Sequence, residues 1–276
     1  MGFYTESAII DDSVVLENKE LYQTEYGIDE IMVECVDFDH EVFQDLIRSD
    51  FREQQLLSEG AEPEVIEESI KETLKNAYEK VVEFIKKWYA KIKTWLNDFV
   101  QKIISKFVAD NKKVYDKYKD AVAKNEKAGE AKVKFPKNVA FEGIKKDFVN
   151  ENILKGLNGD SKVEALSVSK LVDEVTGGIE ETEFSKVKNS VESLLVNGNS
   201  LQSLHKNMLK NVKDTADRLQ KWFKDQSKND KEFAKAKGAV NTTLRNYTTQ
   251  TKANLEALKI YLKCARGAWS KAANHK

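Results

Sequence analysis

The best candidates for site chemistry are three carboxylates near the N-terminus, in the sequence Asp37-Phe-Asp39-His-Glu41. Alternating carboxylates are oxygen ligands of the kind that Ca²⁺ prefers. A calcium-binding loop also needs a glycine for its sharp turn and a more distant bidentate glutamate, and this segment has neither at the required place. The segment therefore predicts no metal site.

Histidine and cysteine are too few and too scattered to form a zinc site or a nucleophilic centre. The chain has three histidines and two cysteines, and none of them has ligand-like spacing to another. It also has no glycine-rich phosphate loop, no nucleophile elbow and no Cys/His pair. Two cysteines make no disulfide framework, so a reducing cytosol is the expected place of synthesis. We predict a non-enzymatic protein without a cofactor.

Charge is divided sharply between two parts of the chain. Residues 1–59 contain 16 acidic and 3 basic residues (net −13), and residues 60–276 contain 30 acidic and 42 basic residues (net +12). Such an asymmetry suggests an acidic segment whose partner carries the opposite charge. The reversal falls within Leu57-Ser58-Glu59-Gly60.

An apolar residue recurs with spacings of 4, 4 and 3 after the charge reversal, which averages about 3.67 residues per turn and matches an α-helix. This pattern predicts one amphipathic helix over about residues 63–126, with Pro63 in its first turn. Its apolar stripe has to be covered by other segments. The twelve positions are Ile66, Ile70, Leu74, Ala77, Val81, Ile85, Trp88, Ile92, Leu96, Phe99, Ile103 and Phe107.

The rest of the chain also reads as helical, with one interruption. Residues 132–143 break the helical period and contain Pro136, which predicts a connector or a short strand pair. Residues 144–195 look like two or three short helices, because glycines punctuate them. Two longer helices follow, one beginning near Ser200 and one over about 231–269, and they are expected to form an antiparallel hairpin.

We therefore expect an all-α protein with minor β-structure near residues 132–143. Its parts would be an acidic N-terminal leader (1–59), a long basic amphipathic helix (60–128) and a helical C-terminal region (129–276). Within the leader, apolar spacings of three and four predict an amphipathic helix from Phe38 to Leu57.

One stretch of the long helix, residues 84–108, is basic, aromatic and amphipathic. Such a helix can lie on a membrane surface, with its aromatic residues at the headgroup boundary. It can also face a protein core, and the continuation of the stripe into an acidic first turn favours that reading. The side chains that would serve either purpose are Trp88, Trp95, Phe99 and Phe107.

A cluster of lysines follows the aromatic stretch and could contact nucleic-acid phosphates. Lysine far outnumbers arginine here, which argues against base-specific recognition and for nonspecific binding. Interspersed lysines also serve solubility alone. The candidate residues are Lys112, Lys113, Lys117, Lys119, Lys124 and Lys127.

Leu57-Ser58-Glu59, followed by Gly60, resembles the Leu/Ile-x-Glu cleavage signal of prohead proteases in large tailed bacteriophages. The resemblance covers residues 1 to about 125 and is one of layout: an acidic leader, a cleavage signal and a basic helical body. Only this copy of the tripeptide lies at the charge reversal, although the pattern also occurs at Ile28–Glu30, Ile66–Glu68 and Ile179–Glu181.

The resemblance implies an internal head protein that a prohead protease processes after Glu59. It would be made in the host cytoplasm and packaged in the capsid interior, where it would contact capsid or other virion proteins and packaged DNA. Two alternatives stay open. The leader could be an uncleaved acidic subdomain docked on the basic body, or it could mask a membrane-active helix that acts at a membrane surface.

Overall fold

The structure is a computed structural model, and it describes residues 27–35, 37–38, 44, 47–48, 51–98, 105–141, 164–196, 199–226 and 230–276. The predicted all-α fold with a minor β-component is confirmed. The named elements are α2 (Pro63–Asp98), α3 (Ser105–Lys124), the 3-10 turn η2 (Ala128–Glu130), β1 (Lys132–Pro136), α5 (Val168–Thr176), β2 (Ile179–Glu183), α6 (Phe184–Val196), α7 (Asn199–Gln226) and α8 (Asp230–Ala273). Residues 27–35 and 51–58 are also helical.

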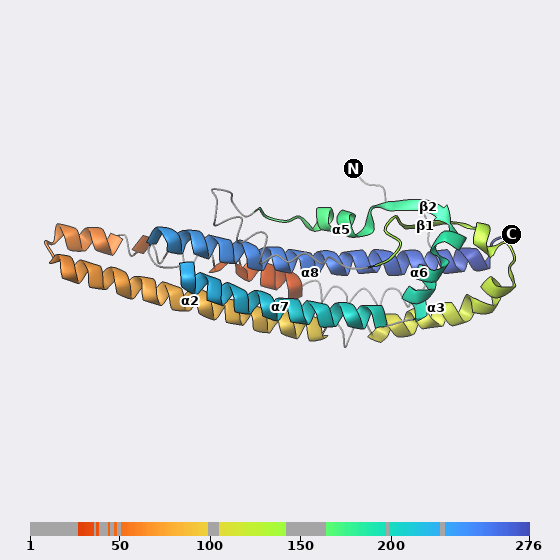
Figure 1. Ribbon diagram of the computed structural model, residues 1–276, viewed down its shortest axis with the longest axis horizontal. Helices are drawn as coiled ribbons and strands as arrows, with labels where there is room; N and C mark the ends of the chain where they lie inside the picture. The colour runs from red at the N-terminus through yellow and green to blue at the C-terminus, as the bar shows by residue number, and fades with distance from the viewer. Residues whose placement is uncertain are drawn as a thin grey trace.

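Helix α8 is the central helix of the molecule and runs along most of its length (Figure 1). Its 44 residues span about 66 Å at 1.5 Å per residue. α2, α3, α5, α6, α7 and β1 all pack against it. Small side chains dominate its surface, so neighbouring elements approach closely, and even its threonines and asparagines are mostly buried.

Buried side chains form two cores, one after the other along α8. The first core lies between α2, α7 and the part of α8 from Phe233 to Leu262, and it also includes residues from the N-terminal segment. The second core lies between α3, η2, β1, α6 and the last part of α8. Because one continuous helix contributes to both, the two cores belong to a single elongated body (Figure 1).

The helix predicted over 63–126 is found as α2 and α3, and residues 99–104 between them lie outside the described residues. The predicted stripe is buried in α2 at Ala77, Val81, Ile85, Trp88, Ile92 and Leu96. Ile66 and Ile70 are only partly buried, because the first turns of α2 extend beyond the first core.

β1 and β2 form a two-stranded antiparallel sheet in which Lys132 is opposite Glu183 and Pro136 is opposite Ile179. The minor β-structure expected near residues 132–143 is therefore confirmed, as one strand and not as a strand pair within that stretch. Its partner comes from the stretch 144–195, for which the sequence predicted only helices. Val133 and Phe135 are buried, whereas the lysines on either side of Val133 are exposed, so one face of β1 closes the second core.

The predicted antiparallel hairpin of α7 and α8 is confirmed, and a buried hydrogen bond holds it. The Tyr247 hydroxyl on α8 donates to the backbone carbonyl of Met208 on α7 at 2.9 Å. Burial raises the pKa of this hydroxyl, with a smaller effect from Asp214. The tyrosine ring also meets the Trp88 ring edge-on at 5.4 Å, which ties the hairpin to α2.

Candidate functional site

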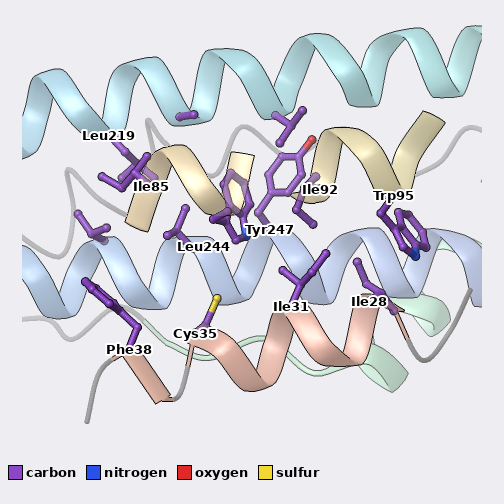
Figure 2. Packing of buried hydrophobic residues seen from close by; sticks show 14 of the residues in the cluster. Ile28, Ile31, Cys35, Phe38, Ile85, Ile92, Trp95, Leu219, Leu244 and Tyr247 are labelled. Carbon is purple, nitrogen blue, oxygen red and sulfur yellow. The ribbon is translucent and has the colours of Figure 1, made fainter. Parts of the chain in front are cut away.

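The acidic N-terminal segment contributes a helix to the first core. Ile28, Ile31, Cys35 and Phe38 are 0–8% exposed and belong to the same buried cluster as α2, α7 and α8. We call the described residues 27–35 and 37–38 the leader helix. Figure 2 shows its apolar side chains pointing toward α8, with Ile28 beside Trp95 of α2. The opposite side of the same helix carries Val33, which is 57% exposed.

Aromatic contacts join the leader helix to α2 at both of its ends. The Phe38 ring stacks on the Phe84 ring, with centroids 3.8 Å apart and planes nearly parallel. At the other end, Gly27 lies so close to Trp95 that a Cβ atom on residue 27 would be 3.3 Å from the indole Cδ1. A larger residue at position 27 would therefore displace the Trp95 side chain or the start of the helix.

Ion pairs reinforce the apolar contacts. The Lys252 ammonium on α8 lies 2.6 Å from an Asp29 carboxylate oxygen, and Lys91 on α2 pairs with Glu34. Burial raises the pKa of the Cys35 thiol to about 12, with the positive charge of Arg245 opposing that rise. We call Phe84, Lys91 and Trp95 of α2 and Arg245 and Lys252 of α8 the leader-binding surface, which combines an aromatic side chain at each end of the leader helix with basic side chains.

The predicted cleavage site lies on an exposed turn at the end of the helix 51–58. The Gly60 amide donates to the Leu57 carbonyl at 3.2 Å, and the Ala61 amide donates to the Leu56 carbonyl at 3.0 Å. These two bonds are the pair expected where a helix ends at a left-handed residue, and Gly60 has a φ of 72°. Because Gly60 has no Cβ, it adopts this conformation without steric strain.

The turn is open to solvent and belongs to neither core. Leu57 is 58% exposed, and Ser58, Glu59 and Gly60 are also exposed. The turn joins the helix 51–58 to α2 at the end of the molecule opposite the C-terminus (Figure 1). Local opening therefore needs to disrupt only the last turn of one exposed helix, which is the usual setting of a protease cut.

The other copies of the tripeptide pattern are held in regular structure. Ile28–Glu30 belongs to the leader helix, where Ile28 is fully buried. Ile66–Glu68 and a further match, Ile70–Glu72, lie within α2, and Ile179–Glu181 forms part of β2. A protease requires an extended substrate, so these copies would demand more extensive unfolding than Leu57–Glu59.

The six candidate nucleic-acid-binding lysines are all exposed, on α3 and on the turn after it. Lys113 pairs with Asp110 at 3.0 Å and Lys119 pairs with Asp116 at 3.2 Å, both within α3. Lys117 lies over the ring of its neighbour Tyr118, 5.2 Å from the centroid. The lysine face is therefore mixed in charge.

The structure places two of the four predicted membrane-or-packing residues in the first core. Trp88 is 2% exposed and Trp95 is 8% exposed, and the Trp88 indole donates to the Thr248 hydroxyl at 3.1 Å. Phe99 and the Phe107 side chain lie outside the described residues. Among the described residues, no helix combines the length and apolar character needed to cross a membrane.

The part of the chain that the structure describes contains no group of three His, Cys, Asp or Glu side chains placed to hold a metal ion. Of the calcium-like segment, Asp37 lies on the leader helix, and Asp39 and Glu41 lie outside the described residues. Cys35 and Cys264 are both free thiols. They belong to different cores, since Cys264 packs beside the second core.

Sequence reasoning missed the leader helix, although a signal for it was present. Ile28, Ile31, Cys35 and Phe38 are spaced by 3, 4 and 3 residues, as are apolar positions on one face of a helix. The surrounding carboxylates hid this signal, because high like charge usually marks a segment that cannot fold by itself. The helix predicted from Phe38 to Leu57 is described at 51–58 and at a few residues before it.

No family model, no curated protein and no solved structure matches this chain.

Proposed function

We propose that this chain is a non-enzymatic structural protein of a bacteriophage particle, an internal head protein whose acidic leader is cut after Glu59 during maturation. The exposed turn at Leu57–Gly60 is the observation that carries the proposal. It lies at the charge reversal, outside both cores, and its tripeptide resembles a prohead-protease signal.

The leader has two roles in the uncut chain under this proposal. Its net charge of −13 offsets the +12 of the body, which limits premature attraction to nucleic acid. Its helix also completes the first core, through Ile28, Ile31, Cys35 and Phe38. The leader is therefore a packed part of the precursor as well as a source of negative charge.

Removal of the leader would leave a strongly cationic body inside the capsid. Such a body binds DNA without sequence preference, because each neutralised phosphate releases counterions, or it lines an inner shell of opposite charge. The exposed α3 lysines, Lys112 and Lys124 among them, are the residues we assign to these contacts.

Intact-mass measurement of the protein from purified particles tests the processing. The expected mass is that of a chain beginning at Gly60, because the turn at Leu57–Gly60 is exposed. A Glu59→Gln variant should keep its leader, and a Glu68→Gln variant, altered at the copy inside α2, should be processed normally. A particle-derived chain that retains Met1 would refute the proposal.

DNA binding by the processed protein tests the proposed contacts. Affinity for random-sequence duplex DNA should fall steeply with salt, and Lys112→Glu or Lys124→Glu should each reduce the slope of log affinity against log salt by about 1. The uncut chain, with its net charge of −1, should show little binding. A salt-independent affinity would show that phosphate contacts are not the basis of binding.

A membrane-active protein is the second candidate, and the position of the leader helix favours it. The leader helix packs on Phe84 and Trp95, which lie in the basic aromatic stretch of α2. Removing it would expose an aromatic surface bordered by lysines, as interfacial helices have. The processed protein should then release dye from anionic vesicles, and Trp95→Gln should abolish release while the helical circular dichroism signal persists.

A further inference from the structure

We propose that the leader-binding surface is a docking site for an acidic amphipathic helix of another protein of the particle, which replaces the leader helix after the chain is cut. The cut that frees the surface is the one proposed above, so this inference rests on the proposed function. The chemistry of docking is taken from contacts that the leader helix makes in the uncut chain.

The leader helix defines what the partner must look like. It places apolar side chains at positions i, i+3, i+7 and i+10, from Ile28 to Phe38, against the first core. It places carboxylates at i+1 and i+6, where Asp29 meets Lys252 and Glu34 meets Lys91. A partner helix with this pattern would fill the same apolar contacts and pair with the same two lysines.

Charge selects an acidic helix over other occupants of an apolar surface. Loss of the leader removes Glu34 from Lys91 and Asp29 from Lys252, beside the Arg245 guanidinium that already acts on Cys35. A basic or neutral helix would leave Lys91 without that carboxylate and Lys252 with the nearby Glu256 of α8 in place of Asp29, at the rim of a newly buried contact, which is unfavourable. An exposed aromatic surface containing Phe84 and Trp95 is also typical of a site that another protein binds.

The proposed cut leaves the docking contacts untouched. Phe84, the nearest leader-binding residue to the turn along α2, follows Pro63 by 21 residues, or about 30 Å along the helix. A cut at Glu59 therefore changes only the connection between the leader and the body. The leader then competes as a separate molecule and loses an effective concentration on the order of millimolar.

The docking site persists without the leader because its residues are anchored elsewhere in the first core. Trp88 and Ile92 of α2 are buried with Leu219 of α7 and Leu244 of α8, and Figure 2 shows several of these side chains on the side of α8 away from the leader helix. α2 also packs on α7 directly. The body is thus expected to keep its helices when the surface is vacated.

Peptide binding to a cut form of the full chain tests the proposal. An orthogonal protease site is inserted between Glu59 and Gly60, so the cut does not depend on the native protease. The probe is a fluorescein-labelled peptide of residues 24–40, followed by fluorescence anisotropy. It should bind the cut protein at least about 100-fold more tightly than the uncut protein, whose tethered leader blocks the surface.

Variant peptides separate docking from nonspecific adhesion. Ile31→Asp should abolish binding, and Val33→Ala, at the exposed position of the same helix, should leave it unchanged. Asp29→Lys should weaken binding to the cut protein about two- to five-fold, the usual effect of one partly exposed ion pair. Pairing that peptide with a Lys252→Glu protein should restore the lost affinity.

Three results would overturn the inference. They are equal binding of the Ile31→Asp peptide, equal binding to cut and uncut protein, and loss of helical circular dichroism when the cut leader is removed by dilution and gel filtration. Particle protein that retains its leader would refute the proposed processing and leave this peptide test unaffected, so the two failures are distinguishable.

Discussion

A single substitution in the leader tests whether the acidic segment belongs to the fold. Ile31 is 5% exposed and packs in the first core. Replacing it with alanine removes buried methyl and methylene groups and leaves a cavity, which typically lowers the free energy of unfolding by about 2–5 kcal/mol. We expect about 3 kcal/mol for Ile31→Ala.

The size of the corresponding thermal shift follows from the length of the chain. At about 2.1 cal/mol/K per residue, a chain of 276 residues has an unfolding entropy of about 0.6 kcal/mol/K. A loss of about 3 kcal/mol therefore lowers the Tm by about 5 °C. Circular dichroism and tryptophan fluorescence should report the same shift, since Trp88 and Trp95 lie in the first core.

Val33→Ala is the matched control. Val33 lies on the same helix, is 57% exposed, and should change the free energy of unfolding by less than about 0.5 kcal/mol. If the leader were a tail without a role in the core, the two variants would have the same stability. Equal Tm values for Ile31→Ala and Val33→Ala would therefore refute the packing of the leader helix.

Three further predictions follow from local features. Gly177→Ala should destabilise the chain by about 1–2 kcal/mol, because residue 177 has a φ of 66° that favours glycine. Gly238 lies inside α8 with open space around it, so Gly238→Ala should stabilise the chain by about 0.5–1 kcal/mol. Urea unfolding measures both changes. Burial lowers the pKa of Lys259 from 10.5 to about 8, so the unfolded chain binds more protons than the folded chain between these pH values and stability rises with pH there; Lys259→Met should remove this rise when urea unfolding is compared at about pH 8 and about pH 10.5. The Asn246 amide donates to the Glu164 carbonyl and accepts from the Leu166 amide, each at 2.9 Å, so Asn246→Ala should cost about 2 kcal/mol and speed hydrogen exchange at residues 164–166.

The parts of the fold that were predicted correctly depend on local pattern. The spacing of Ala77, Val81 and Ile85 predicted the buried face of α2, because side chains that recur every 3.6 residues share one face of a helix. The helix predicted to begin near Ser200 is α7, which begins at Asn199. The break in the helical period at residues 132–143 predicted a connector or a short strand pair, whereas β1 pairs with β2, which lies more than 40 residues away and has no local signature.

The candidate site was likewise predicted from the sequence only in part. The charge reversal and the tripeptide Leu57–Glu59 predicted the position of the proposed cleavage site, and the structure has an exposed turn there, with Gly60 at a φ of 72°. The burial of Ile28 and Phe38 was not predicted, since a segment with net charge −13 lacks the composition of a core element. That charge is tolerated because carboxylates of the leader helix face lysines of the body.

The sequence by itself determined the helical periods, the hairpin of α7 and α8, and the opposite charges of the leader and body. Only the tertiary structure decided which surface covers the stripe of α2 and which lysines the acidic leader meets. The physical reason is range: a period is set by neighbours within a few residues, whereas the Asp29–Lys252 pair joins side chains 223 positions apart. Such a pair exists only once α2, α7 and α8 have assembled the surface on which the leader helix lies.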